Sequence, residues 1–188
     1  MKRAATVVLA LAVAWVVTAG PVASGDVFKA EMPAFIMSAG QSMDAEMIYV
    51  CAKRARLTMT YDPMATYDTI RKSGAKTLIV GFGNSGKGLG AAGVSEKAEY
   101  QRINDVLSKA KRDNIVIIGA HVGGSVRRGA ITHQFMDPFL GYCNAFFCLE
   151  DSDFDGFFTR ASKEHGWPLM KVPEITDLGG LLKQVFSK

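Results

Sequence analysis

Short apolar runs alternate with longer segments of helical periodicity along most of this 188-residue chain. Six runs predict strands, because each is four or five residues long and is bounded by turn-forming residues. These runs span residues 34–37, 57–60, 77–80, 114–118, 145–149 and 168–172. Segments that predict helices follow at residues 43–56, 65–73, 95–112, 132–142, 157–165 and 176–186. Pro138 interrupts the fourth of them, which predicts two shorter pieces there.

This alternation predicts a parallel sheet with helices on both faces, since parallel strands need crossover connections and bury both their faces. Right-handed crossovers leave few topologies, and we expect the order 2-1-3-4-5 with strand 6 extending the last edge. The predicted fold is therefore a three-layer α/β/α sandwich of flavodoxin-like or Rossmann-like type, with a mainly parallel sheet of five to six strands. Residues 25–188 are enough for a single domain of this kind.

Residues 1–24 have the pattern of a secretory signal peptide. Lys2 and Arg3 precede an apolar run over residues 4–19, and small residues follow, so cleavage is expected after Ser24 or Ala19. The alternative is an uncleaved anchor, although the run is shorter than the roughly 20 residues that a spanning helix needs. We expect an exported protein, periplasmic or extracellular, with no stable membrane span after cleavage.

Charge and cysteine content narrow the function classes. The chain has 22 Lys and Arg against 18 Asp and Glu, and two of the cations lie in the predicted signal peptide. This near-balance, without a basic stripe interleaved with aromatic residues, argues against nucleic-acid binding. Cys143 and Cys148 could form a disulfide after export, or they and Cys51 could be buried free thiols. No Cys and His spacing resembles a zinc site.

Residues 81–93 hold six glycines and Lys87 directly after the third predicted strand. A glycine-rich segment can turn sharply and offer backbone N–H groups to a ligand, and the lysine adds positive charge. Gly81-x4-Gly86-Lys87 nearly matches a phosphate-binding P-loop, but Gly88 replaces the Ser or Thr that binds Mg²⁺. The predicted helix also begins late, near Ser95. We therefore expect a flexible loop that covers a polar ligand, or a long surface loop without one.

Small and polar residues also follow the first and fourth predicted strands, at the edge where such sheets bind ligands. Ser42 could begin a helix whose N–H groups hold an anion, or it could act only as the N-cap. His121 could transfer protons or be a structural residue, and a neighbouring arginine could grip a carboxylate or phosphate. The predicted ligand-binding residues are Ser38, Gly40, Gln41, Ser42, Gly83, Asn84, Ser85, Gly86, Lys87, Gly88, His121, Gly123, Gly124, Arg127 and Arg128.

An acidic turn follows the fifth predicted strand. Asp151, Asp153 and Asp155 alternate before Gly156, which is the spacing of the first half of a calcium loop. The twelfth position is Ser162 instead of the bidentate Glu, and acidic residues before a helix are favourable without any metal. These carboxylates are thus a possible Ca²⁺ site, and no other cofactor is predicted.

Three functional hypotheses remain open at this stage. The first is an exported binding module for a small polar or anionic ligand. The second is a hydrolase, because residues 38–42 resemble the Gly-x-Ser start of SGNH-type serine esterases and residues 81–84 resemble their Gly-x-Asn block. Ser42 would be the nucleophile, but the matching Asp-x-x-His near the C-terminus is missing. The third is an interaction module for a cell-envelope protein.

The chain as a whole resembles a family of exported bacterial α/β domains of unknown function. The likeness rests on residues 38–42, on residues 86–93, on residues 118–124 with Arg127-Arg-Gly129, and on the acidic Asp-Gly turn before Phe157. The resemblance implies a flavodoxin-like or Rossmann-like fold and a cell-envelope location. It implies no activity and no catalytic residue.

Overall fold

A computed structural model describes residues 27–187, so the predicted signal peptide lies outside the described residues. The strands are β1 (Ala34–Ala39), β2 (Thr60–Tyr61), β3 (Thr77–Phe82), β4 (Val116–His121), β5 (Ala145–Leu149) and β6 (Leu169–Val172). The α-helices are α1 (Asp44–Arg54), α2 (Tyr67–Lys72), α3 (Gly86–Ala92), α4 (Glu96–Arg112), α5 (Ala130–Met136), α6 (Phe157–His165) and α7 (Leu178–Val185). Short 3₁₀ helices are η1 (Ser125–Arg127), η2 (Asp137–Tyr142), η3 (Glu150–Asp153) and η4 (Ile175–Asp177).

The strands form one parallel sheet in the order β2-β1-β3-β4-β5-β6, which confirms the predicted topology. β1 and β3 pair over their whole length, from Ala34 opposite Thr77 to Ala39 opposite Phe82. Their carboxyl ends therefore meet at the same edge, and the loops that follow them must share the space above it.

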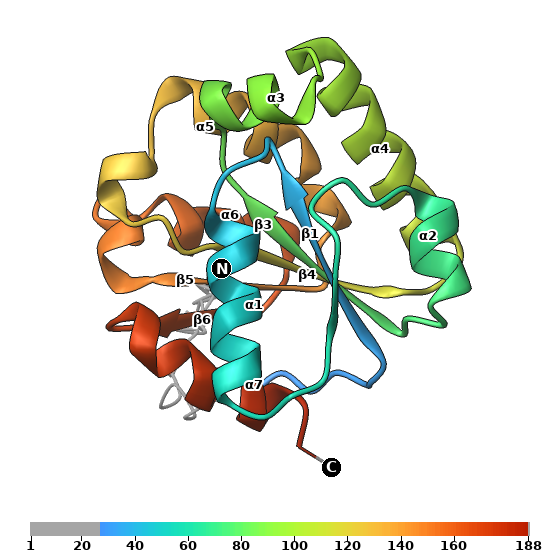
Figure 1. The fold of residues 1–188 in the computed structure, drawn as a ribbon. Coiled ribbons are helices and arrows are strands. Elements are labelled where there is room, and N and C mark those ends of the chain that lie inside the picture. Colours follow the sequence, from blue (N-terminus) through green and yellow to red (C-terminus); the bar gives the residue numbers. More distant parts are fainter. Residues whose placement is uncertain (1–26, 188) are drawn as a thin grey trace, which may run out of the picture.

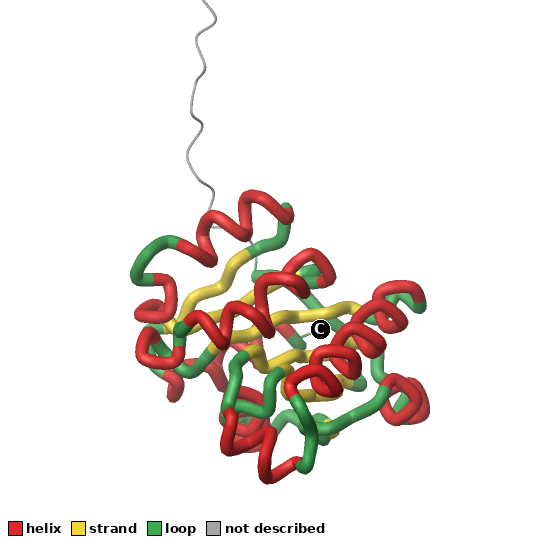
Figure 2. The backbone as a smooth tube through the Cα atoms, turned by 90° about the horizontal axis from the view of Figure 1, so that it is seen from above, coloured by secondary structure: helices red, strands yellow, loops and turns green. Residues whose placement is uncertain are grey.

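Helices cover both faces of the sheet, which makes the fold the predicted three-layer α/β/α sandwich (Figures 1 and 2). α1 and α7 pack on one face, together with Ile36 and Ile79 of the central strands. α2, α4, α5, η2 and α6 supply the other core, together with Phe35, Met37 and Val80. Because neighbouring strand residues point to opposite faces and both faces are buried, the central strands β1, β3, β4 and β5 are mostly apolar along their length. Within residues 27–187, no helix is both long and apolar enough to cross a membrane.

The second strand is shorter and later than predicted. β2 comprises only two residues, which pair with Phe35 and Ile36 of β1. The residues predicted for it turn the chain away from α1, with Arg56 in the left-handed region and Leu57 donating its N–H to the Ala52 carbonyl. The predicted break at Pro138 is confirmed, since α5 ends at Met136 and η2 continues from Asp137.

The glycine segment is not the predicted loop. β3 continues to Phe82, and α3 begins at Gly86, about nine residues before the expected helix. The Ser85 hydroxyl caps α3 by accepting the N–H of Gly88, and Gly93 ends it in the left-handed conformation. Leu89 anchors the short helix because its side chain is buried. The helix therefore does not start too late for a P-loop, although the sequence had indicated a late start. The other argument still holds, because Gly88 occupies the position where a P-loop has the Ser or Thr that binds Mg²⁺.

All three cysteines are free thiols and buried, so the disulfide alternative for Cys143 and Cys148 is wrong. Burial raises the pKa of the Cys143 and Cys148 thiols to about 12, which keeps these two protonated and chemically inert.

Candidate functional site

The loops after β1 and β3 pair with each other at the carboxyl edge of the sheet. Gln41 and Asn84 form an isolated antiparallel bridge, and the Ser85 N–H donates to the Gly40 carbonyl at 2.9 Å. The Gly83 N–H donates to the Ala39 carbonyl at 3.0 Å. In sheets of this kind a ligand often binds in a crevice at the carboxyl ends of the strands. Here the protein's own backbone closes that space between β1 and β3.

Two glycines of the segment permit this close contact. A Cβ atom on Gly83 would lie 2.5 Å from the Ser42 hydroxyl and 2.8 Å from Oδ2 of Asp44. A Cβ atom on Gly88 would lie 2.0 Å from the Gln41 carbonyl oxygen. All three distances are shorter than van der Waals contact, so a side chain at either position would push the loops apart. These glycines serve loop packing in the structure.

A buried ion pair lies beneath the paired loops. Glu99 is fully buried and accepts the Gly40 N–H at 3.0 Å and the Gln41 side-chain amide at 2.9 Å. Arg102 donates to both Glu99 oxygens, at 2.9 and 2.8 Å, and to the carbonyls of Ser38 and Ala65. Burial would raise the pKa of Glu99, but the Arg102 guanidinium and the Gln41 and Gly40 donors bring it below its usual value. Sequence reasoning missed this pair.

A second buried network joins Ser42, Asp44 and His121. The Ser42 hydroxyl donates to Oδ2 of Asp44 at 2.6 Å, and Oδ1 of Asp44 accepts the Val122 N–H at 2.8 Å. Nδ1 of His121 lies 3.6 Å from the same Asp44 oxygen. The His121 ring nitrogens face backbone carbonyls, at 2.9 Å to Phe82 and 3.4 Å to Gly124. In the structure His121 thus bonds to the backbone, and its role in proton transfer stays a prediction.

This network differs from the arrangement that serine hydrolysis needs. A catalytic serine bonds to an imidazole, which a carboxylate then orients. Here Ser42 bonds to the carboxylate itself, and His121 lies on the far side of Asp44. Ser42 precedes the N-cap of α1, which is Met43, although its hydroxyl still accepts the Asp44 N–H at 3.3 Å. The predicted N-cap assignment for Ser42 is therefore wrong by one residue.

The predicted ligand-binding residues divide into an inner group and an outer group. The inner group is buried and comprises Ser38, Gly40, Ser42, Gly83, His121 and Gly124. The outer group is partly or fully exposed and comprises Gln41, Asn84, Ser85, Gly86, Lys87, Gly88, Gly123 and Arg127. We call this outer group the rim, and it is the part of the carboxyl edge that a ligand can reach.

The rim carries two exposed cations, Lys87 and Arg127. Neither forms an ion pair within residues 27–187. A Cβ atom on Gly123 would lie 2.6 Å from Cδ of Arg127, so the arginine stem lies back over the end of β4. The side-chain amide nitrogen of Asn84 is shielded from solvent and has no hydrogen-bond partner among the described residues.

Arg128 does not belong to this rim. Its side chain is only 2% exposed and pairs with both Asp155 oxygens, at 2.9 and 3.0 Å. It also donates to the Ser152 carbonyl and packs over the rings of Phe157 and Phe158. The Arg128 guanidinium lowers the pKa of Asp155 to about 2. The expectation that Arg128 grips a ligand is corrected, because the side chain is buried and both of its Nη atoms are bonded inside the protein.

The three carboxylates of the acidic turn also have protein partners. Asp151 accepts the Ser125 N–H and hydroxyl, and Asp155 binds Arg128. Asp153 accepts from Thr159 and lies 2.6 Å from Nζ of Lys171, and these donors lower its pKa although burial would raise it. Within residues 27–187, no group of three or more His, Cys, Asp or Glu side chains is arranged to hold a metal ion. Calcium binding at this turn stays a prediction.

Comparisons with known proteins give a family but no activity. A family model described as "Domain of unknown function (DUF6305)" matches residues 31–186. No curated protein matches the chain. Among solved structures, the SGNH-hydrolase family esterase AlinE4 is 13% identical with a TM-score of 0.29, covering 80% of this chain and 78% of its own. The psychrotrophic esterase EstA from Pseudoalteromonas sp. is 9% identical with a TM-score of 0.32, covering 80% and 92%. Such low TM-scores carry no argument about activity.

Proposed function

The chain belongs to this family of domains of unknown function, and from its own geometry we propose that it binds a small anion at the rim. The proposal rests on one observation, namely that Lys87 of α3 and Arg127 of η1, which follow the adjacent strands β3 and β4, form no ion pair in the described residues. Two such cations favour a carboxylate or phosphate, and arginine suits either by bidentate hydrogen bonding.

Other rim groups support the same ligand class. Asn84 stands three residues before Lys87, and its amide nitrogen, which has no partner among the described residues, would donate to an anion once the side chain turned outward. Beneath them, the Glu99–Arg102 pair and the loop bridge hold the backbone rigid, so little order has to be gained on binding. Because both cations are exposed, the attraction should weaken as salt rises.

Calorimetry with inorganic phosphate and with succinate tests the proposal. The double variant Lys87→Met, Arg127→Met should lose binding of either probe while keeping its circular dichroism spectrum. The matched control Arg71→Met, Lys72→Met removes the same charge from the end of α2 and should bind as the unmodified protein does. Equal affinities for the two double variants would contradict the proposal.

The location of this binding is part of the proposal. We infer from residues 1–24 that the protein is exported, so that the anion is bound in the periplasm or outside the cell. The N-terminal sequence of the protein purified from its host's envelope fraction should begin after Ala19 or Ser24. An intact Met1 in that fraction would contradict cleavage.

A further inference from the structure

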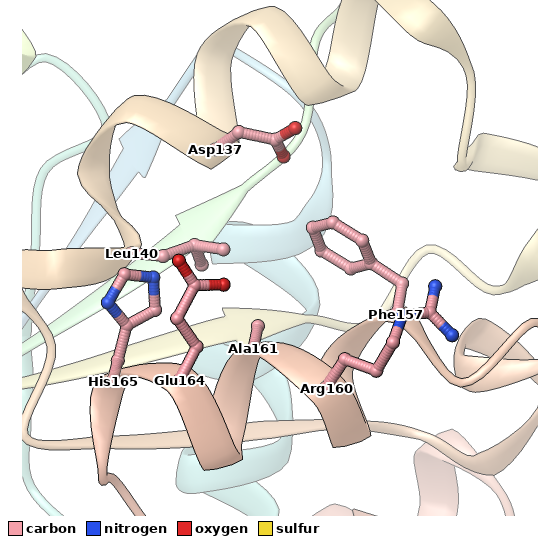
Figure 3. A pocket seen from close by; sticks show the side chains of 7 residues that line it. All are labelled: Asp137, Leu140, Phe157, Arg160, Ala161, Glu164 and His165. Carbon is pink, nitrogen blue, oxygen red and sulfur yellow. The ribbon is translucent and has the colours of Figure 1, made fainter.

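A separate cavity of about 320 Å³ lies between η2 and α6, away from the rim (Figure 3). Its lining residues are Asp137, Leu140, Phe157, Arg160, Ala161, Glu164 and His165. Five of these come from one face of α6, at the spacing of successive helical turns. A volume near the lower end of the usual range for ligand pockets suits a small molecule. We call this cavity the α6 groove.

Apolar and acidic groups have separate places in the α6 groove. Leu140, Ala161 and Phe157 form its apolar lining. Figure 3 shows Glu164 reaching from α6 toward η2, with Asp137 on the opposite wall and Leu140 between them. His165 closes one end, where its ring would contact a Cβ atom on Gly141 at 3.8 Å. The groove thus presents two carboxylates on either side of an aliphatic surface.

The Asp137 carboxylate is held by a hydrogen bond from His133. Nδ1 of His133 lies 2.8 Å from Asp137, and Nε2 of His133 lies 3.1 Å from Nη2 of Arg128. A guanidinium can only donate, so Nε2 must accept and the ring proton must be on Nδ1. His133 then donates from Nδ1 to Asp137, which orients the carboxylate.

Arg160, the arginine that lines the groove, is turned away from these acids. Nη1 of Arg160 donates to the Asp155 carbonyl at 2.7 Å, and Figure 3 shows its guanidinium beyond Phe157. Glu164 forms no ion pair within residues 27–187. The Lys111 ammonium lies beside η2 but is bonded to the Gly141 carbonyl, so within residues 27–187 no lysine or arginine pairs with the carboxylates of Asp137 and Glu164 on the two walls of the groove.

We propose that the α6 groove binds an organic dication, in which two ammonium groups are joined by an aliphatic chain. The chain would lie on Leu140 and Ala161, and the ammonium groups would pair with Asp137 and Glu164. A single amine would satisfy only one carboxylate, and an anion would meet like charges. This site is independent of the anion-binding rim.

Calorimetry with putrescine, a four-carbon diamine, tests this site against butylamine and succinate. Putrescine should bind saturably at millimolar concentration, and butylamine should bind more weakly by up to about fivefold, the usual limit for one exposed ion pair. Glu164→Gln should weaken putrescine binding by a similar factor. Glu96→Gln is the matched control, because it removes an exposed carboxylate from the first turn of α4.

Amide chemical shifts locate the binding independently of the variants. Putrescine should shift residues 137–141 and 157–165 in the unmodified protein, and inorganic phosphate should not. No saturable binding of putrescine, equal binding by succinate, or unchanged affinity in Glu164→Gln would each overturn the proposal. None of these outcomes bears on Lys87 and Arg127.

Discussion

Replacing Arg102 with Met tests whether the buried ion pair holds the carboxyl-edge loops in place. Glu99 is fully buried and the Arg102 side chain is 12% exposed, so the pair is almost free of solvent. The substitution removes both bonds from Arg102 to Glu99 and leaves the Ser38 and Ala65 carbonyls without these donors. Removing one partner of a buried pair costs about 3–5 kcal/mol, because the remaining charge stays buried.

Helix α4 offers a matched control in an exposed pair. Lys109 lies 2.7 Å from Asp105, and both side chains are about half exposed. Lys109→Met removes the same charge from the same helix and should cost only about 0.2–1 kcal/mol. The contrast between the two variants isolates burial as the cause.

Urea unfolding followed by the fluorescence of the buried Trp167 gives the free energy of unfolding for each variant. We expect Arg102→Met to lower the free energy of unfolding several times more than Lys109→Met does. The dependence of that free energy on urea concentration should stay the same in both variants. A loss below about 1 kcal/mol for Arg102→Met would refute it, because the pair would then behave as an exposed one.

Four further outcomes follow from the same geometry. Gly83→Ala should destabilise the fold by about 1–3 kcal/mol through overpacking. Gly90→Ala should stabilise α3 by up to about 1 kcal/mol, because its new Cβ atom meets no atom within 4 Å. Similar changes in thermal stability for the two variants would count against the role of Gly83 in loop packing. The folded-state pKa of Glu99 lies below its ordinary value of 4.5. Ionised Glu99 therefore adds to the free energy of unfolding above that pH, and this stabilisation is lost as the pH falls through the folded-state pKa. Glu99→Gln should flatten this acid loss in urea series at successive pH values, and an unchanged slope would show that Glu99 is not its source. Acetyl esters should not be hydrolysed, because Ser42 bonds to Asp44 and not to an imidazole; turnover that Ser42→Ala abolishes would reverse this expectation. If the acidic turn binds calcium as predicted, titration with Ca²⁺ should give saturable heat that Asp151→Asn abolishes, although its carboxylates must then exchange protein donors for the ion. No heat at millimolar Ca²⁺ would end that prediction.

The fold was predictable because its main signal is local. Strands buried on both faces are mostly apolar, and the helices between them keep their own periodicity. α3 was missed because three glycines in its seven residues disfavour a helix intrinsically. The Ser85 cap, the Gly93 terminus and the burial of Leu89 overcome that preference, and only the tertiary structure shows the last of these.

The candidate site was predictable in location but not in its internal partners. Strand ends placed Ser42, Gly83 and His121 together, as expected for a parallel sheet. Glu99 resembles an ordinary acidic residue in the first turn of a helix, and its burial depends on a loop about sixty residues earlier. Arg127 and Arg128 are adjacent in sequence, and no local pattern indicates that only the second one is buried in an ion pair.

An amide chemical-shift titration of the isotope-labelled protein with inorganic phosphate tests most directly whether the rim binds an anion. We expect saturable shifts at residues 84–88 and 123–127. These shifts should disappear in the double variant Lys87→Met, Arg127→Met and persist in the control double variant Arg71→Met, Lys72→Met. Shifts that do not saturate, that map to other residues, or that remain in the Lys87 and Arg127 double variant would contradict an anion site at the rim.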